Sequence, residues 1–352
     1  MAAPTVDKHV ELGFVEETDK FLLKSRFFPS KVGGRPAWLS LKSLPTPEEL
    51  SCSLCSKLMK FLMQIYSPDP SKESCFHRTI FIFVCDNTNC CKSNCAGHLV
   101  VFRSQLQQIN EFYSSKPPVE ARVDKEIDAS LHNKLCRVCG CLGPKTCGKC
   151  HKVSYCSKEH QAVDWKENHK QECSSDSADV ASEKNYNCLF PEFELVTETE
   201  NVPTKGTKEK NDATKMKEYE EFLKSAKGSD AGESLPDSEL QSMAGKGTDN
   251  DKQLLKFKER ISFEPEQVLR YDKGGEPLWI AHSPKPQAIP DCDCGAKRQF
   301  EFQVLPHLLS HLNVDRLGAS LDWGTLCVYT CVDSCETGNQ YKREFIFKQD
   351  VI

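Results

Sequence analysis

Cysteine and histidine side chains at regular spacing dominate the stretch from residue 136 to residue 173. It holds two Cys-x2-Cys pairs, one Cys-x3-His pair and one His-x3-Cys pair. Zinc takes four such ligands in a tetrahedron, so eight ligands suffice for two closed sites that leave no position for water. A segment this small gains its folding free energy from the metal. The sequence therefore predicts two structural zinc ions rather than a metal-free loop, with these ligands: Cys136, Cys139, Cys147, Cys150, Cys156, His160, His169 and Cys173.

The order of these ligands resembles the MYND zinc finger, in which ligand pairs alternate between two metals. His160 stands where that family usually has Cys, a replacement that zinc accepts. The resemblance also implies a shallow groove for Pro-rich peptides, whose lining residues match Gln161 and Trp165; alternatively, Trp165 forms the small core of the finger itself. The implied ligand sets are Cys136, Cys139, Cys156 and His160 for one ion, and Cys147, Cys150, His169 and Cys173 for the other.

Composition narrows the class of protein. A chain of 352 residues has room for two or three domains. Its net charge of −5 and pI near 6.1 argue against a protein built to coat nucleic acid. Residues 1–30 lack an apolar run of the signal-peptide type, and no stretch approaches the length of a membrane span. We therefore expect a soluble intracellular protein, in which the 20 cysteines serve as metal ligands rather than disulfides.

Outside the finger, the two ends of the chain repeat one pattern. The string Gly-Gly-x-Pro-x-Trp occurs at residues 33–38 and again at 274–279. A close cysteine pair follows each copy, then an apolar segment containing Gln64 or Gln303, then a strand that ends on a cysteine. Both copies close on an aromatic strand. So many features in one order indicate two copies of one β-rich unit.

Each copy carries two close cysteine pairs, which is the arrangement of a ribbon-type zinc site. In the first copy, Cys75, His77, Cys91 and Cys95 are spare residues that could replace a ligand. The alternative is that these cysteines are buried and metal-free. The predicted ligands are Cys52, Cys55, Cys85 and Cys90 in the first copy, and Cys292, Cys294, Cys331 and Cys335 in the second, with one zinc ion each.

The expected fold is mainly β or α+β, with two homologous zinc-bound halves forming one domain that a finger and a disordered linker interrupt. An acidic strand segment presents Glu192, Glu194, Glu198 and Glu200 on one face, unless it is an ordinary charged edge strand. The halves span residues 1–113 and 252–352, the finger 134–173, the acidic strand segment 186–200, and the linkers 114–133, 174–185 and 201–251, of which the last is predicted to be disordered.

Motifs that would indicate an enzyme are missing from the sequence. It contains no P-loop, no Gly-x-Gly-x-x-Gly after a strand, no His-Glu-x-x-His and no Gly-x-Ser-x-Gly. The helical part of the finger mixes both signs of charge and lacks arginine, so direct DNA binding is not favoured. His307 and His311 stand at i and i+4 in an expected helix over 305–317. They could form a metal pair, but without a nearby acidic partner we interpret them as helix-surface histidines.

Strings along almost the whole chain resemble the programmed cell death protein 2 family. That resemblance implies a β-rich domain in two halves around a MYND finger. It also implies a dedicated chaperone for one small-subunit ribosomal protein, that of the mRNA entry channel, which is captured as it is made and delivered to nuclear assembly. The older family label concerns cell death and transcriptional regulators. The strings are VELGF (10–14), FPSKVGGRPAWL (28–39), the finger, NCLFPEFELV (187–196), PEQVLRY (265–271), IPDCDCGAKR (289–298) and EFQVLP (301–306).

We therefore expect a non-enzymatic, zinc-dependent chaperone that supports small ribosomal subunit biogenesis in cytoplasm and nucleus, without membrane contact. The paired β units would hold the basic client by β-augmentation at a strand edge and by charge, with the four glutamates of the acidic strand facing it. The alternative is an adaptor linked to apoptosis, which binds Pro-rich segments of transcriptional corepressors through Trp165.

Overall fold

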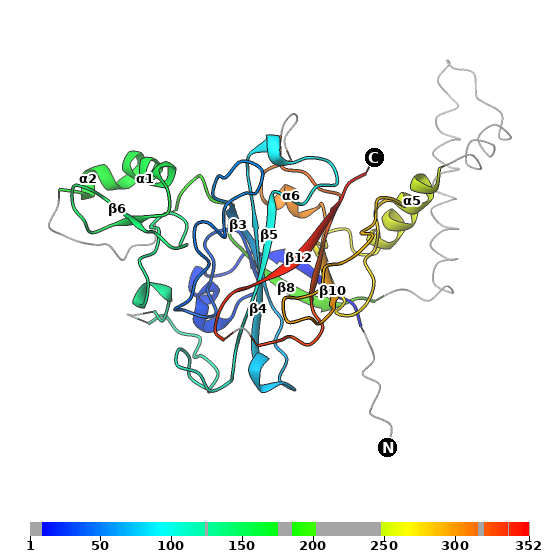
Figure 1. The fold of residues 1–352 in the computed structure, drawn as a ribbon, viewed down its shortest axis with the longest axis horizontal. Coiled ribbons are helices and arrows are strands. Elements are labelled where there is room, and N and C mark those ends of the chain that lie inside the picture. Colours follow the sequence, from blue (N-terminus) through cyan, green and yellow to red (C-terminus); the bar gives the residue numbers. More distant parts are fainter. Residues whose placement is uncertain are drawn as a thin grey trace, which may run out of the picture.

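The strands of both halves close into a single barrel (Figure 1). The computed structural model describes residues 9–123, 126–174, 185–201, 248–315, 320–336 and 338–351, so most of the predicted disordered linker lies outside the described residues. Around the barrel the strands follow the order β1-β8-β2-β3-β4-β5-β12-β11-β10-β9, and β9 returns to β1. The prediction of a mainly β domain made of two similar halves around a finger is confirmed.

An approximate two-fold symmetry relates the two halves. All neighbouring barrel strands are antiparallel. Read outwards from the β1–β8 pair, the order β8-β2-β3-β4-β5 corresponds to β1-β9-β10-β11-β12. The last strands of the two halves, β5 and β12, meet where Arg103 pairs with Lys342. The strands are β1 (Glu11–Glu16) and β8 (Phe193–Thr199); β2 (Lys31–Val32), β3 (Lys60–Tyr66), β4 (His77–Val84) and β5 (Leu99–Leu106); and β9 (Leu269–Tyr271), β10 (Arg298–Val304), β11 (Thr325–Cys331) and β12 (Lys342–Gln349).

The predicted repeat extends to side-chain contacts. The amide of Gln64 clamps the residue before the first repeated Trp: it accepts a hydrogen bond from the N–H of Ala37 at 2.9 Å and donates one to its carbonyl at 3.2 Å. Gln303 holds Leu278 in the same way at 2.6 and 3.0 Å. A β-bulge also interrupts the register at equivalent places, beside Phe61 on β3 and Phe300 on β10.

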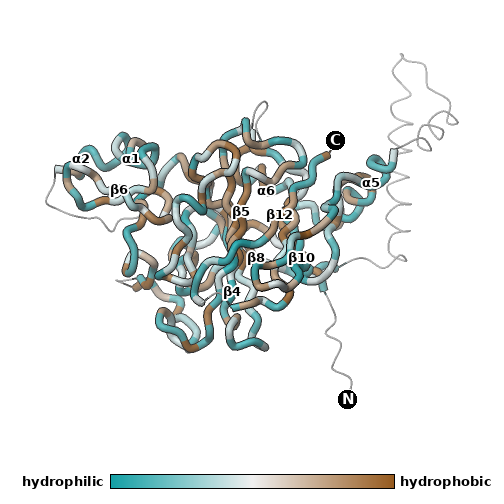
Figure 2. Tube along the Cα trace, viewed as in Figure 1, coloured by the Kyte–Doolittle hydropathy of each residue, from teal (hydrophilic) through white to brown (hydrophobic). Residues whose placement is uncertain are grey.

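Aliphatic side chains at alternate strand positions fill the barrel, and the central strands are accordingly hydrophobic in Figure 2. Because strands on opposite walls contribute to one cluster, that cluster must lie inside. The other face of β3, β4 and β5 carries aromatic rings, which pack beneath the loop after Trp38 and beneath the finger. The interior cluster includes Leu62, Ile80, Ile82, Val101, Leu195, Leu269, Phe302, Val304, Leu326, Val328 and Ile346.

Helices are short. Helix α5 (Asp249–Ile261) begins after Thr248, which forms a capping box with Asp251, and ends before Pro265. The helix expected over 305–317 is reduced to α6 (Leu308–His311), because the backbone turns left-handed at Asn313 with φ 56°. No described helix has the length and apolarity that crossing a bilayer requires. The 3-10 turns are η1 (Lys20–Leu23), η2 (Ser25–Phe27), η3 (Glu73–Cys75), η4 (Thr88–Cys90) and η5 (Ala129–Leu131).

The acidic strand β8 is not an edge strand. It pairs with β1 along six residue pairs, from Glu194 to Thr199, and with β2 at Phe193 and Glu194. Because the barrel strands close on themselves, each of them has a paired neighbour on both sides. The described barrel therefore has no edge strand of the kind that the expected β-augmentation would use.

Candidate metal centres and binding surfaces

The finger brings its eight predicted ligands together as two separate groups of four. Within each group the ligand atoms lie within 4.8 Å of one another. In the first group the sulfurs of Cys139 and Cys156 are 3.6 Å apart, and Cys156 Sγ lies 3.0 Å from His160 Nδ1. In the second group Cys147 Sγ is 3.9 Å from Cys173 Sγ, and Cys150 Sγ is 3.4 Å from His169 Nε2. The groups are Cys136, Cys139, Cys156 and His160, and Cys147, Cys150, His169 and Cys173.

Short elements of the finger position these ligands. Strands β6 (Lys145–Thr146) and β7 (Ser154–Tyr155) form a small hairpin. Helix α1 (Lys158–Asp164) starts at Ser157, whose hydroxyl accepts a hydrogen bond from the N–H of His160. A π-helical turn, η6 (Trp165–His169), and α2 (Lys170–Glu172) continue this helix and carry His169 and Cys173 to the second group.

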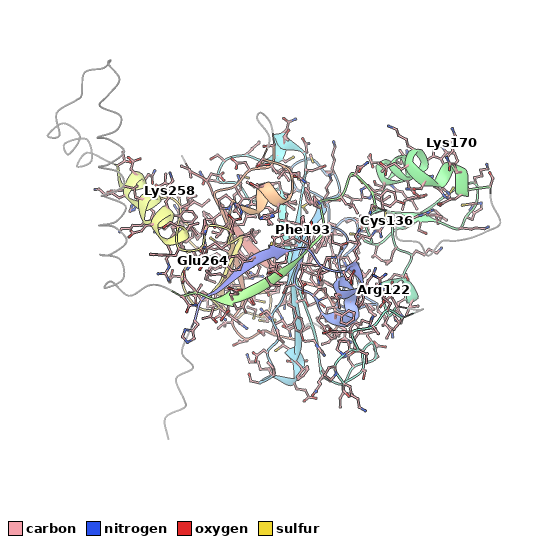
Figure 3. All side chains as sticks on the ribbon, turned by 180° about the vertical axis from the view of Figure 1, so that it is seen from behind. Arg122, Cys136, Lys170, Phe193, Lys258 and Glu264 are labelled. Carbon is pink, nitrogen blue, oxygen red and sulfur yellow. The ribbon has the colours of Figure 1, made fainter. Side chains whose placement is uncertain are left out.

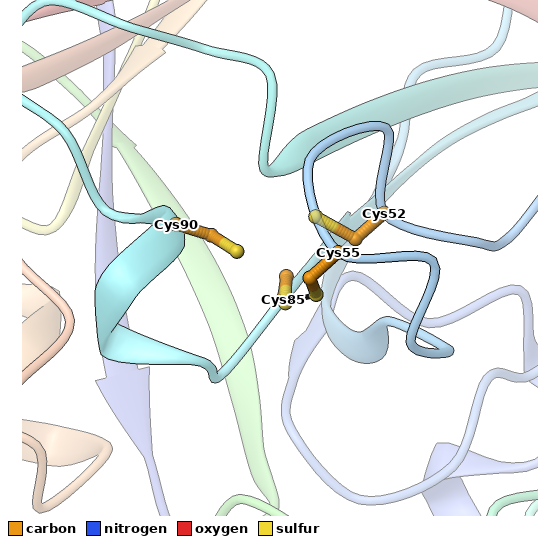
Figure 4. A group of neighbouring side chains, drawn as sticks. All are labelled: Cys52, Cys55, Cys85 and Cys90. Carbon is orange, nitrogen blue, oxygen red and sulfur yellow. Dashed lines mark hydrogen bonds between the residues drawn. The ribbon is translucent and has the colours of Figure 1, made fainter.

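In the first β-rich half, the four predicted cysteines also converge (Figure 4). Cys52 and Cys55 lie on a turn, Cys85 follows β4, and Cys90 ends η4. The sulfurs of Cys55 and Cys85 are 3.6 Å apart. Hydrogen bonding, first of all from the backbone N–H of Lys57, outweighs desolvation and lowers the pKa of Cys55 to about 7, which favours the metal-binding thiolate.

The second half has an equivalent cluster, in which Cys292 Sγ lies 3.7 Å from Cys335 Sγ and Cys294 Sγ lies 3.7 Å from Cys331 Sγ. Burial opposes ionisation of Cys335, but the nearby ammonium of Lys342 contributes to lowering its pKa to about 7. The clusters found among the described residues do not include the spare residues Cys75, His77, Cys91 and Cys95.

The donor sets fit zinc. Zinc–sulfur bonds of about 2.3 Å place the sulfurs of a tetrahedral site about 3.8 Å apart. Five sulfur–sulfur distances, drawn from all four clusters, range from 3.6 to 3.9 Å, and all ligand atoms of a cluster lie within 4.8 Å of one another. All sixteen donors are thiol sulfur or imidazole nitrogen, which suit zinc far better than magnesium or calcium.

The finger is docked on the first half through its Gly-Gly-x-Pro-x-Trp string. The guanidinium of Arg35 donates hydrogen bonds to the carbonyls of Val138 and Arg137, each at 2.9 Å. The indole N–H of Trp38 donates to the carbonyl of Gly140 at 2.8 Å. The acceptors lie on the turn between the first two finger cysteines and directly after it, so the barrel holds this zinc knuckle by its backbone.

The chain leaving the finger adds a second attachment. Asp164, which is fully buried, accepts hydrogen bonds from the hydroxyls of Tyr155 at 2.7 Å and Tyr186 at 2.6 Å. Tyr155 belongs to the finger, whereas Tyr186 precedes β8. One carboxylate therefore ties the finger to the segment that returns to the barrel.

The two residues matched to the peptide groove lie one turn apart on the finger helix. Trp165 is 36% exposed, and its ring meets His169 edge-on with 5.8 Å between centroids. Gln161 is half-buried. Trp165 therefore packs against a ligand histidine and is partly exposed to solvent.

The four glutamates of the acidic strand do not act together. Glu192 forms an ion pair with the buried Lys31. Glu200 accepts from Arg260 at 2.5 Å and Arg270 at 2.8 Å, and these arginines outweigh the effect of burial and lower its pKa. Two of the four predicted client-binding carboxylates are thus neutralised within the chain. Glu194 and Glu198 have no ion-pair partner among the described residues.

A cavity of about 740 Å³ lies where the finger meets the barrel. Stretches far apart in sequence line it, so no local pattern could have predicted it. Its walls come from η1, the Gly-Gly-x-Pro-x-Trp string of the first half, the finger, residues 185–192, and residues 312–314 and 320–321. His307 and His311 do not line this cavity. The fold brings an acidic side chain to this pair, since a carboxylate oxygen of Glu266 is 3.2 Å from His307 Nε2. The premise that no acidic partner lies near the two histidines is therefore wrong.

A closed β barrel of two similar halves, with a finger carrying two four-ligand clusters docked on the first half, defines a MYND-finger protein built on an internal repeat. Three family models match the chain: programmed cell death protein 2, N-terminal domain, on residues 9–120; its C-terminal putative domain on 251–350; and the MYND finger on 136–173. The chain belongs to the programmed cell death protein 2 family.

Relatives match over the full length. Programmed cell death protein 2 of Rattus norvegicus is 47% identical over 99% of this chain and 98% of its own length. The Bos taurus protein of that name is 48% identical over 97% of this chain and 96% of its own. The probable 20S rRNA accumulation protein 4 of Schizosaccharomyces pombe is 23% identical over 95% of each. No solved structure matches the chain significantly.

Proposed function

We propose that this protein is a zinc-binding chaperone that captures a newly made small-subunit ribosomal protein, that of the mRNA entry channel. It accompanies this client from the cytoplasm to nuclear assembly and so supports production of the small ribosomal subunit. The role is non-enzymatic. Zinc ions on the four cysteine clusters hold the finger and the outer loops of both halves in place.

The observation that carries this proposal is the relative in Schizosaccharomyces pombe. It covers 95% of this chain, including both β-rich halves and the finger, and its name refers to the accumulation of an rRNA. None of the three matching family models is named for an enzymatic activity. A role in ribosome production without catalysis agrees with both findings.

The barrel surface supports binding of a basic client by charge. Glu194 on β8 stands directly opposite Glu16 on β1. Like charges opposite each other destabilise a sheet unless a cation neutralises them. On the other side of Glu194 stands Lys31 of β2, but Lys31 is buried and pairs with Glu192. None of the described residues forms an ion pair with Glu194 or Glu16, and Glu198 on the same face is exposed. Cationic residues of the client would relieve this repulsion, which makes β1 and β8 the client-facing ribbon in our proposal.

Affinity purification of the tagged full-length protein from nuclease-treated lysate, followed by mass spectrometry, tests the proposal. We expect one small-subunit ribosomal protein in near-stoichiometric amount. The Glu194→Lys/Glu198→Lys variant should recover less of it, whereas the matched Glu48→Lys/Glu73→Lys variant, which reverses two exposed charges elsewhere, should not. Absence of any ribosomal protein from the wild-type sample would refute the function. Equal recovery by both variants would refute only the role of the ribbon.

A second function is favoured by the exposure of Trp165. It is the one aromatic residue among the exposed large hydrophobic side chains of the described residues. Tryptophan is a typical anchor for a peptide groove. As an adaptor, the protein would bind Pro-rich segments of transcriptional corepressors through Gln161 and Trp165. In the same experiment, Trp165→Ala should then remove Pro-rich regulators and leave the ribosomal protein bound.

A further inference from the structure

Three side chains outside the cysteine clusters converge near α6. Glu266, His307 and His311 offer one donor atom each, and these atoms all lie within 4.8 Å of one another. His307 Nε2 is 3.2 Å from a carboxylate oxygen of Glu266, and the two imidazole rings are 5.1 Å apart between centroids. Histidines at i and i+4 share one face of a helix, so both can bind one ion.

The backbone that carries these donors is held firmly. Leu308, Leu309 and Leu312 of α6 and its C-cap are buried in the core of the barrel. Ahead of the helix, the N–H of Leu305 donates to the carbonyl of Val268 at 2.9 Å, which joins the histidine segment directly to the glutamate segment. The two segments therefore keep their relative positions without any ligand.

The neighbouring residues leave the donors accessible. On one side, the ring of Phe193 on β8 packs edge-on against the ring of His311. Figure 3 labels Phe193 and also Glu264, which begins the turn that carries Glu266. The side chains of His307 and Glu266 are 34% and 74% exposed, so water can reach the remaining coordination positions.

An ordinary hydrogen bond does not account for the whole group. A bond between Glu266 and His307 explains two of its members. That bond does not explain the position of His311. The His311 ring makes no hydrogen bond to any described residue, although one of its nitrogens lies within 4.8 Å of the donor atoms of Glu266 and His307. Two imidazoles and one carboxylate are the donor set that zinc, copper and nickel prefer, whereas magnesium and calcium prefer oxygen ligands alone.

We propose that Glu266, His307 and His311 bind one divalent transition-metal ion, with Zn²⁺ as the natural occupant, in an open three-ligand site. Water completes the coordination in the isolated protein. Two of its three ligands are uncharged imidazoles, and the site is exposed to solvent. It therefore exchanges its metal faster than the buried thiolate clusters. Metal there ties α6 to the turn after α5, two segments that are about 40 residues apart in sequence.

Zinc titration of the full-length, untagged protein tests this site. Protein purified with zinc under reducing conditions is first dialysed against metal-free buffer, which leaves tightly held ions in place. Calorimetric titration with Zn²⁺ is then performed on the wild type, on His307→Ala, on His311→Ala and on Glu266→Gln. His282→Ala, which removes an exposed histidine outside any cluster, serves as the matched control.

We expect the wild type and His282→Ala to take up one more equivalent of zinc than either α6 histidine variant. Loss of an outer-shell partner already weakens metal sites by about 10–100-fold, so loss of a direct ligand should weaken this one by at least about tenfold. Added zinc should also raise the melting temperature of the wild type and not that of His311→Ala. Equal uptake by wild type and His311→Ala, or no uptake by the wild type, would overturn the proposal.

Discussion

Substitution of Glu301 by Gln should destabilise the barrel and change how its stability depends on pH. Glu301 on β10 and Arg78 on β4 form a two-pronged ion pair at 2.5 and 2.7 Å, and both side chains are fully buried. These strands are not neighbours in the barrel, so the pair connects the two halves across the interior. Hydroxyls of Ser67, Tyr271 and Thr330 complete the hydrogen bonding of the carboxylate.

The magnitude follows from the pKa of the carboxyl. Burial alone would raise the pKa of Glu301, but the charge and hydrogen bonds of Arg78 outweigh burial and lower it from 4.5 to about 2. That difference corresponds to about 3 kcal/mol of stability. Because the folded pKa is depressed, this stability is present above about pH 4.5 and is lost as pH falls towards 2. A loss of about 3–5 kcal/mol is also typical when one partner of a buried ion pair is removed.

Urea denaturation of the wild type and Glu301→Gln at several pH values measures the effect. The gap between them should be about 3 kcal/mol at pH 7 and should shrink below pH 4.5. Comparing two proteins that share the same cysteine clusters cancels any loss of metal in acid. The double variant Arg78→Met/Glu301→Leu, which removes both charges, should be more stable than the single variant. A gap below about 1 kcal/mol, or one that does not change with pH, would refute the reasoning.

Three further perturbations test the metal clusters and the docked finger. Cys85→Ser should lower the zinc content by one equivalent, measured by elemental mass spectrometry, whereas Cys75→Ser should leave it unchanged although Cys75 is also buried. Trp38→Phe removes the hydrogen bond to Gly140 and should destabilise the docked finger by about 1 kcal/mol, seen as faster cleavage near residue 134 by a protease. Chelation of zinc at neutral pH should abolish the protection of the finger's backbone amides from hydrogen exchange, while the amides of the barrel core remain protected. Equal loss of amide protection in the finger and in the core would contradict this.

Sequence reasoning succeeded where chemistry repeats locally. The two Gly-Gly-x-Pro-x-Trp strings, aligned with Gln64 and Gln303, predicted the repeat, because each glutamine must clamp the same backbone turn. Cysteine spacing predicted groups of four whose sulfurs do converge in space, since a tetrahedral site restricts how far apart its ligand pairs can stand.

Prediction from sequence failed for contacts that depend on which strands become neighbours. Nothing near β8 in sequence shows that β1 and β2 will flank it, so an edge strand was a reasonable expectation. For the same reason Glu200 was expected to face a client, whereas Arg270, 70 residues further on, pairs with it. The acidic neighbour of His307, Glu266, is also brought in by the barrel from another strand connection. These contacts join residues that are far apart in sequence, so they could not be predicted from the residues on either side of each one.

The finger contacts the first half through residues that the second half does not fully reproduce. Trp38 is 2% exposed and its indole N–H is bonded to the finger, while Arg35 holds the same zinc knuckle. At the equivalent positions of the second half stand Trp279 and Glu276. A carboxylate cannot donate to knuckle carbonyls as Arg35 does, and no described residue accepts a hydrogen bond from the Trp279 indole, whose ring instead meets Lys285. The repeat thus places a tryptophan at equivalent positions in both halves, but only the first half has an arginine beside it to donate hydrogen bonds to the finger.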